Sequence, residues 1–272
     1  LSSLYQEHTG RYFNHNVHSV RVLDDMVNWN ISLQTLDGIL CHNGELELKE
    51  YRPCEMSTFV EYDKKVEACY VDENAIGELI PCTLEGCVMR ICDIIAYLGK
   101  DRQDAMRLNL LKESPFTAGA IGTSNGEIIN NFSVNIIENS YGRDYLKMDE
   151  EYFDALRQAK KENYEMIYNN KSLNDLYENE IRPMFGELYE ELLRQAESGD
   201  KSSVFYRHHM AYMEKNNFYV KSHVRKPYAE QEKNQLVVDY LASMTDDYFI
   251  ALYHYLFPKG KHDVKFVGYF DL

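Results

Sequence analysis

The segment "RICDIIAYLGKDRQDAM", residues 90–106, decides the character of the fold. Its apolar residues recur at the three- and four-residue spacing of a helix, and they are numerous enough to bury most of the segment. Asp93, Tyr97 and Asp101 interrupt that pattern at intervals of four, so they form a row along one helix face. We therefore expect a long core helix over about residues 83–111 that carries one polar row.

Two interpretations of this polar row remain open from the residues alone. In the first, Asp93 caps a neighbouring element, the Tyr97 hydroxyl finds a partner in the core, and Asp101 is solvated. In the second, the row is the wall of a pocket. Asp93 is then a hard oxygen ligand for a divalent metal, Tyr97 presents a flat ring, and Asp101 accepts hydrogen bonds from a ligand hydroxyl.

Helical periodicity also dominates the chain on both sides of this segment. A helix capped by Ser32 is expected to end near Gly44. Four long amphipathic stretches follow in the second half, at residues 150–169, 172–198, 203–216 and 230–257. Strand-like alternation is scarce outside residues 263–272. These patterns predict an all-α fold.

The composition limits the classes of function. Hydrophobic residues make up 44% and charged residues 27% of the 272 residues, as in soluble globular proteins with a sizeable core. The formal net charge of −15 argues against strong nucleic-acid binding, which needs Lys and Arg to displace counterions. A small polyanion stays open as a substrate, because a few local cations can hold a phosphate inside an acidic protein.

The six cysteines form no CxxC pair, which argues against zinc-knuckle and thioredoxin-like sites. No apolar run reaches the ~18 residues of a membrane span, and the first residues have no targeting character. We therefore expect reduced thiols, a cytoplasmic protein and no membrane contact. The chain begins with Leu1 and not Met, so we expect a processed chain or a piece of a longer protein.

Two further groups of residues are candidates for a site. His15 and His18 share a helix face and suit a metal ligand, a general acid or a phosphate contact, or else a helix-start histidine satisfied by the backbone. Lys160, Tyr164 and Tyr168 are spaced four apart and suit a phosphate and a sugar or base. Core tyrosines beside a lysine whose charge reaches water are the commoner explanation of the second pattern. No Walker, GxGxxG or GxSxG motif occurs.

Four stretches together resemble one family. They are "FNHNVHSVRVL" (13–23), "WNISLQTLDGILCHNGE" (29–45), "LEGCVMRICDIIAYLGKDRQDA" (84–105) and "VVDYLASMTDDYFIALYHYLF" (237–257). In this order they resemble the deoxyguanosinetriphosphate triphosphohydrolase (dGTPase) family, a branch of the HD-domain phosphohydrolases. The resemblance implies an all-α, HD-like helical bundle. Residues 1–145 would be the C-terminal part of the HD core and residues 146–272 a helical C-terminal subdomain, and we expect the two parts to form one compact unit.

The resemblance also implies an activity and a set of site residues. The family cleaves a deoxynucleoside triphosphate to the deoxynucleoside and tripolyphosphate. Asp93 matches a metal ligand, Tyr97 a tyrosine that packs against the deoxyribose, and Asp101 an acid near the sugar 3′-hydroxyl. His15 matches a catalytic histidine that faces the phosphates. Lys160, Tyr164 and Tyr168 match, more loosely, a helix that closes over triphosphate and sugar.

The chain departs from the family at the metal site. The family's first His and its His-Asp pair precede the segment that matches residues 13–23, and no match to either stands ahead of that segment in these 272 residues. We therefore expect an incomplete ligand set for a divalent ion (Mg, Mn, Fe, Ni or Co) and an inactive or nearly inactive isolated chain. The resemblance further implies a homo-oligomer. The competing hypotheses are an HD phosphohydrolase that acts on another nucleotide and a non-catalytic nucleotide-binding or assembly module.

Overall fold

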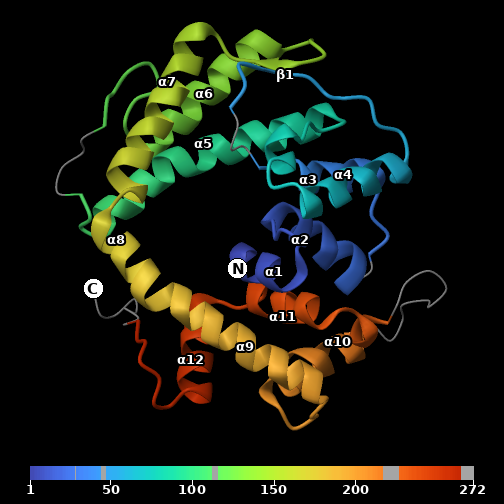
Figure 1. Ribbon diagram of the computed structural model, residues 1–272. Helices are drawn as coiled ribbons and strands as arrows, with labels where there is room; N and C mark the ends of the chain where they lie inside the picture. The colour runs from blue at the N-terminus through green and yellow to red at the C-terminus, as the bar shows by residue number, and fades with distance from the viewer. Residues whose placement is uncertain (28, 44–46, 112–115, 217–226, 265–272) are drawn as a thin grey trace. The chain divides into compact units, whose positions relative to one another are not determined.

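The computed structural model describes residues 1–27, 29–43, 47–111, 116–216 and 227–264. Within these ranges the only sheet is a two-stranded antiparallel one, in which β1 (Glu50–Tyr51) pairs with β2 (Leu146–Lys147). The remaining regular structure is helical (Figure 1). The predicted all-α fold class is confirmed. The extended segment expected over residues 263–272 lies outside the described residues from residue 265 onward.

Contacts between residues divide the chain into two compact units. The first unit consists of residues 1–14, 21–30 and 172–272, and the second unit consists of residues 15–20 and 31–171. The expected boundary at residue 145, between an HD core and a C-terminal subdomain, stays a prediction, as does the expectation that the two parts form one compact unit.

One long helix, α5 (Leu84–Arg107), organises the second unit. It begins where the Thr83 side chain accepts a hydrogen bond from the Gly86 backbone N–H. It ends before the predicted residue 111, because Asn109 adopts a left-handed φ of 55°. Three helices pack against it: α3 (Leu33–Leu40), α6 (Asn125–Ser140) and α7 (Glu150–Asn163).

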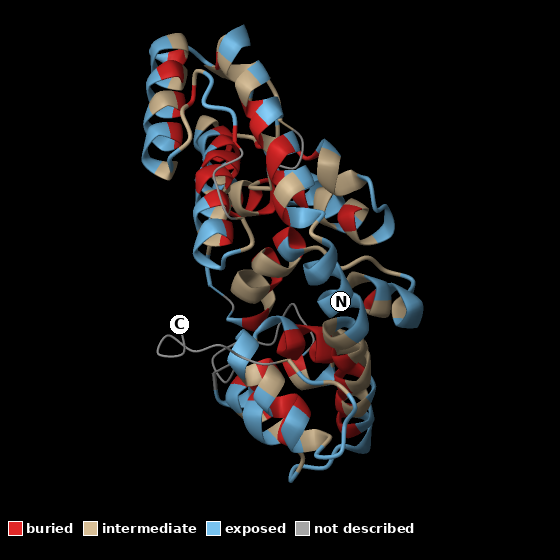
Figure 2. Cartoon of the chain, turned by 90° about the vertical axis from the view of Figure 1, so that its left-hand side faces the viewer, coloured by how far each residue is buried: buried red, intermediate tan, exposed pale blue. Residues whose placement is uncertain are grey.

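The core of the second unit contains two main clusters of buried hydrophobic side chains. One lies where α5, α6 and α7 meet, and includes Leu98, Phe132 and Leu156. The other joins α3 to α4 (Phe59–Val71) and includes Leu40 and Tyr62. In Figure 2 several helices are buried along one side and exposed along the other, as expected for amphipathic helices.

The local signals at helix ends are confirmed in part. Ser32 caps α3 as predicted, since its side chain accepts a hydrogen bond from the Thr35 backbone N–H. The helix nevertheless ends at Leu40, earlier than the predicted Gly44. The predicted helix over residues 150–169 is α7 followed directly by a π-helical turn, η3 (Tyr164–Tyr168).

The second half of the chain, together with α1 (Ser2–Thr9), supplies most helices of the first unit. They are α8 (Lys171–Leu176), α9 (Arg182–Ser198), α10 (Ala211–Asn216), α11 (Lys233–Ala242) and α12 (Asp246–Leu256), with η1 (Val22–Met26) earlier in the chain. The helix α2 (His15–Arg21) belongs to the second unit up to residue 20. Both α1 and α9 pack against α11. The stretch predicted over 230–257 breaks between α11 and α12, because the Thr245 side chain caps α12 by accepting a hydrogen bond from the Tyr248 N–H.

A buried polar network joins elements of the first unit. Arg21 and Asp239 form an ion pair of 2.6 Å, and the Asp239 side chain is fully buried. The Tyr228 hydroxyl donates to Asp239 over 3.0 Å and lies 2.7 Å from His209 Nε2. Each of these buried polar groups therefore has a partner, as a low-dielectric interior requires.

Candidate functional site

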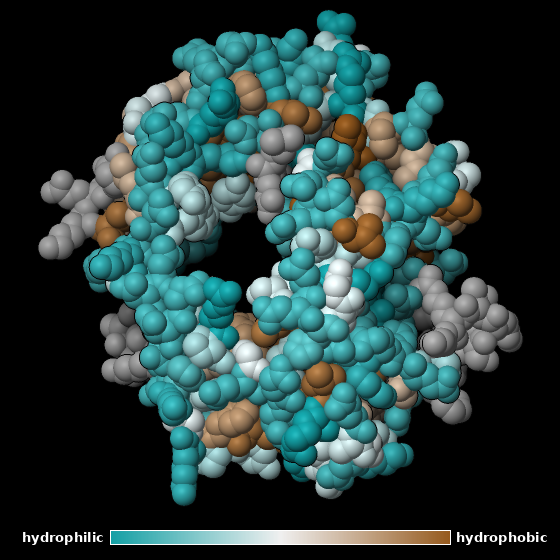
Figure 3. Space-filling model, viewed as in Figure 1, coloured by the Kyte–Doolittle hydropathy of each residue, from teal (hydrophilic) through white to brown (hydrophobic). Residues whose placement is uncertain are grey.

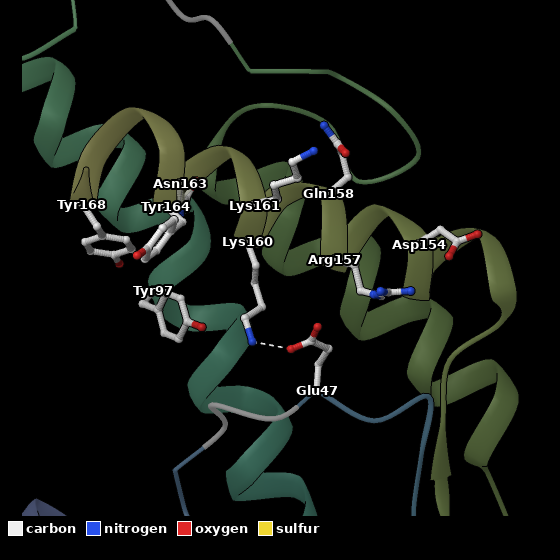
Figure 4. A pocket seen from close by; sticks show the side chains of 10 residues that line it. All are labelled: Glu47, Tyr97, Asp154, Arg157, Gln158, Lys160, Lys161, Asn163, Tyr164 and Tyr168. Carbon is white, nitrogen blue, oxygen red and sulfur yellow. Dashed lines mark hydrogen bonds and ion pairs between the residues drawn. The ribbon is translucent and has the colours of Figure 1, made fainter. Parts of the chain in front are cut away.

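A cavity of about 690 Å³ opens on the second unit (Figure 4). Its walls come from α5, α7, the turn η3 and the segment before β1. The lining residues are Glu47, Tyr97, Asp154, Arg157, Gln158, Lys160, Lys161, Asn163, Tyr164 and Tyr168. Most of them belong to one continuous helical segment, so the orientation of α7 controls the shape of the cavity.

The start of α7 is fixed by a well-formed cap. The Asp149 carboxylate accepts a hydrogen bond from the Tyr152 backbone N–H over 3.0 Å and another from the Asn135 side chain over 2.6 Å. Such a cap satisfies an orphan N–H and favours a negative charge at the positive end of the helix dipole. Asp149 therefore ties the beginning of α7 to α6.

The far end of α7 is held to α5 by a buried polar cluster. Arg102 of α5 donates from Nε to the Asn163 Oδ1 over 2.8 Å, and its Nη2 lies 3.2 Å from Glu162. Asn163 in turn donates to the Leu98 carbonyl over 3.0 Å. The Arg102 side chain is 2% exposed and stacks over the Phe116 ring at 4.0 Å. The cavity wall is thereby fixed to the core helix.

The structure brings five of the sequence-predicted residues together. Tyr97, Lys160, Tyr164 and Tyr168 all line the cavity, and their side chains lie side by side in Figure 4. Asp101 joins them because it accepts a hydrogen bond from the Tyr168 hydroxyl. Burial, reinforced by the hydrogen bond to Asp101, raises the pKa of Tyr168, so this phenol stays a proton donor at neutral pH.

The cavity has an aromatic end and a charged end. Tyr97, Tyr164 and Tyr168 form the aromatic end, while Lys160 forms an ion pair with Glu47 at the other (Figure 4). Burial, the largest single influence, opposes ionisation of Glu47. The hydrogen bond from Lys160, a backbone hydrogen bond and the charges of Lys160 and Arg157 together outweigh burial and lower the pKa of this carboxyl below its usual range. Glu47 is therefore ionised at neutral pH.

Besides Asp101, which only contacts a lining residue, two predicted residues do not line this cavity. Asp93 lies on α5 one helical turn before Tyr97 and is partly buried. His15 begins α2, and its ring meets the ring of His42 edge-on with centroids 5.2 Å apart. His42 lines a separate cavity of about 740 Å³ together with α3 residues and the start of α5. The roles inferred for Asp93 and His15 stay predictions.

The residues present do not by themselves fit a metal centre. In the part of the chain that the structure describes, no three His, Cys, Asp or Glu side chains are grouped so that they could hold an ion. A catalytic metal site uses about three protein ligands. Asp93 alone falls short of that number.

Six of the ten lining residues, Glu47 and Arg157 among them, were not predicted from the sequence. The helical spacing could have predicted Arg157, because this residue precedes Lys160 by three positions and so shares its helix face. Glu47 carries no such signal. It meets Lys160 across 113 positions of sequence, and only the tertiary fold brings the two together.

Comparisons with known proteins agree with the motif order in the sequence. Residues 146–255 match a family described as the phosphohydrolase-associated domain. The chain is 26% identical over 249 residues to a deoxyguanosinetriphosphate triphosphohydrolase-like protein of Clostridium perfringens (strain SM101 / Type A), covering 87% of this chain and 58% of the relative. It is 25% identical over 260 residues to the Clostridium tetani protein of the same name, covering 91% and 60% respectively.

The predicted family resemblance is confirmed. The dGTPase-like relatives, which align with most of this chain, and the phosphohydrolase-associated domain together support the assignment of the chain as a dGTPase-like member of the HD phosphohydrolases. A further relative with the dGTPase-like name, from Desulfatibacillum aliphaticivorans, is 23% identical over 255 residues, which cover 90% of this chain and 62% of that protein. The chain thus spans less than two thirds of the length of these dGTPase-like relatives. No solved structure matches it.

Among the described residues, no helix is both long and apolar enough to cross a membrane. The face drawn in Figure 3 is largely hydrophilic, with hydrophobic residues in scattered patches.

Proposed function

We propose that this chain forms the nucleotide-binding part of a metal-dependent triphosphohydrolase, which hydrolyses a deoxynucleoside triphosphate, dGTP above all, to the deoxynucleoside and tripolyphosphate. One observation carries the proposal. A single cavity combines three tyrosine rings at one end with the cations Lys160 and Arg157 toward the other. A nucleoside and a phosphate chain need those two chemistries side by side. The names of the dGTPase-like relatives favour the same substrate class.

Each lining residue has a proposed role in binding. The Tyr97 ring packs against the deoxyribose and leaves little room for a 2′-hydroxyl. Asp101 accepts a hydrogen bond from the sugar 3′-hydroxyl. The Tyr168 hydroxyl already donates a hydrogen bond to the Asp101 carboxylate and so orients it. Lys160 and Arg157 neutralise the phosphates, and Tyr164, whose side chain is exposed, closes over the sugar or base.

The hydrolytic step belongs to the whole protein in this proposal. Asp93 is proposed as one ligand of a divalent metal and His15 as a catalytic group that faces the phosphates. The remaining metal ligands would lie outside these 272 residues. The chain alone is then expected to bind nucleotide with little or no turnover. The homo-oligomer and the cytoplasmic location stay predictions.

The Tyr97→Ala variant tests the binding site. The ring occupies the space that a 2′-hydroxyl needs, so the native chain should bind dGTP more tightly than GTP, and the variant should lose most of that preference. Isothermal titration calorimetry in EDTA gives both dissociation constants. Tyr141→Ala is the matched control, because Tyr141 is 88% exposed and does not line the cavity. A Tyr97→Ala variant that still excludes GTP, or a native chain that binds neither nucleotide, would disprove the proposed site.

A binding or assembly module without turnover is the second candidate. It is favoured by a specific observation: the described residues contain a nucleotide-sized cavity but no grouped metal ligands. Phosphorus NMR of products separates the alternatives, using the full-length natural protein supplied with each divalent metal. Tripolyphosphate supports the triphosphohydrolase, a monophosphate product indicates another HD phosphohydrolase activity, and unchanged nucleotide supports the binding module.

A further inference from the structure

Glu47 stands where a bound anion is expected. Its carboxylate forms the ion pair with Lys160 inside the cavity, and the two side chains are only 20% and 21% exposed, respectively. Because both are partly withdrawn from water, this pair is stronger than an ion pair on an open surface. A ligand phosphate that uses Lys160 has to compete with a carboxylate already in place.

Hydrogen bonds anchor the backbone next to Glu47, and this anchoring fixes where the side chain enters the cavity. The Leu48 backbone N–H donates to the hydroxyl of Tyr51 over 3.0 Å, and Tyr51 is 2% exposed. The Lys49 carbonyl accepts from the Met148 N–H over 3.2 Å, next to the β1–β2 pair. Both contacts lie within two residues of Glu47. They fix its point of attachment opposite α7.

Because few charges line the cavity, the charge of Glu47 strongly affects how well the cavity attracts an anion. Its cations are Arg157, Lys160 and Lys161, and its acids are Glu47 and Asp154, so the lining carries a net charge of +1 in a chain of net charge −15. Removal of one acid doubles that local excess. The cavity is therefore a place where a single carboxylate controls the attraction for an anion.

We propose that Glu47 is an internal competitor for Lys160, which weakens the binding of phosphate chains and promotes the release of tripolyphosphate. This rests on the proposed function, since tripolyphosphate is the expected product there. The effect grows with the number of phosphates on the ligand and vanishes for a ligand without phosphate. Glu47 thus sets how strongly charge, as opposed to the nucleoside, contributes to affinity.

Calorimetry on the 272-residue chain tests the inference with three probes in EDTA: inorganic tripolyphosphate, dGTP and deoxyguanosine. Glu47→Gln keeps the shape and removes the charge. It should lower the dissociation constant for tripolyphosphate and for dGTP by about fivefold, as expected for one partly buried ion pair, and leave deoxyguanosine unchanged. Glu150→Gln is the matched control. It removes the same charge from the exposed Lys49–Glu150 pair outside the cavity and should change none of the three constants.

A double-mutant cycle shows whether the effect acts through Lys160. In a Lys160→Gln background, the further change Glu47→Gln should tighten tripolyphosphate binding by a clearly smaller factor, because only the through-space effect of the lost charge remains. Glu47→Asp gives a second variant, since it keeps the charge but draws it back by one methylene, and it should tighten binding by a smaller factor. Circular dichroism confirms that each variant is folded.

The outcomes separate the two proposals. Equal or weaker tripolyphosphate binding in both Glu47 variants would overturn the role of Glu47, as would equal tightening in Glu150→Gln or in the Lys160→Gln background. A native chain that binds tripolyphosphate but shows no preference for dGTP over tripolyphosphate or over GTP would overturn the proposed nucleotide site and leave the role of Glu47 standing.

Discussion

At the scale of single residues, Arg102 links the cavity wall to the core. It follows Asp101 directly in α5 but points into the interior, where it contacts Glu162 and Asn163 of α7. Burial, which is opposed by the charge of Glu162, lowers the pKa of Arg102 from its ordinary value. A buried charge of this kind is costly to leave without its partner. The neighbouring residues Asp101 and Arg102 therefore differ in role: Asp101 belongs to the candidate site, and Arg102 holds the cavity wall to the core.

The Arg102→Met variant should lower the free energy of unfolding by roughly 3 kcal/mol, because it leaves the Glu162 carboxylate buried without its cation. Urea denaturation followed by circular dichroism gives this value. Arg107→Met, at the exposed end of the same helix, should change it by less than about 0.5 kcal/mol. Equal effects from both substitutions would show that the buried contacts of Arg102 contribute nothing specific.

At the scale of elements, the crossing of α5 and α6 depends on a glycine. A Cβ atom placed on Gly99 would lie 2.6 Å from the Cα and 2.7 Å from the side-chain Oδ1 of Asn125, the first residue of α6. Real Cβ atoms do not approach backbone so closely. The two helices can meet here only because position 99 carries no side chain.

The Gly99→Ala variant should therefore destabilise the protein by about 1–3 kcal/mol, although alanine is the better helix former by about 1 kcal/mol. Gly126→Ala in α6 is the control, since nothing lies within 4 Å of a Cβ at that position. It should be neutral or stabilise by up to about 1 kcal/mol. Thermal unfolding of the two variants in parallel decides the matter, and a stable Gly99→Ala variant would mean that α5 and α6 can separate without cost.

The sequence predicted which residues share one helix face better than it predicted which helix faces contact each other. The spacing of four placed Asp93, Tyr97 and Asp101 on one face of α5, because a helix of known period has only one way to align them. The contact between Asp101 and Tyr168 spans 67 positions, and no local pattern encodes it. The break between α11 and α12 was missed for a different reason: a Thr cap interrupts an apolar pattern that continues on both sides.

At the scale of the whole molecule, the charge distribution makes the chain sensitive to acid. Backbone hydrogen bonds from Ser57 and Ser124 lower the pKa values of Glu61 and Glu127, each in a capping box. A carboxyl whose folded pKa is lowered stabilises the protein above its unfolded pKa, and that contribution is lost as the pH falls through the folded pKa. The stabilising contribution of these two carboxyls is lost only below about pH 4.3, the usual pKa of a free Glu. Loss of stability at a higher pH requires a different group.

His209 is that group. Burial, partly offset by the charge of Asp239, lowers its pKa to about 4 from the ordinary value of 6.5. Between those two values the unfolded chain binds a proton that the folded chain does not, so stability falls as the pH falls. The loss between about pH 7 and pH 5 should be about 2 kcal/mol, measured by urea denaturation at both values.

His209→Gln should abolish most of this pH dependence, because the amide keeps a donor that can reach Tyr228 but does not titrate. His208→Gln is the matched control, since His208 is the exposed neighbour on the same π-helical turn and should leave the pH dependence intact. If His209→Gln loses as much stability between the two pH values as the native chain, the acid sensitivity above pH 5 originates elsewhere. The buried network of Arg21, Tyr228 and Asp239 would then tolerate a charged His209.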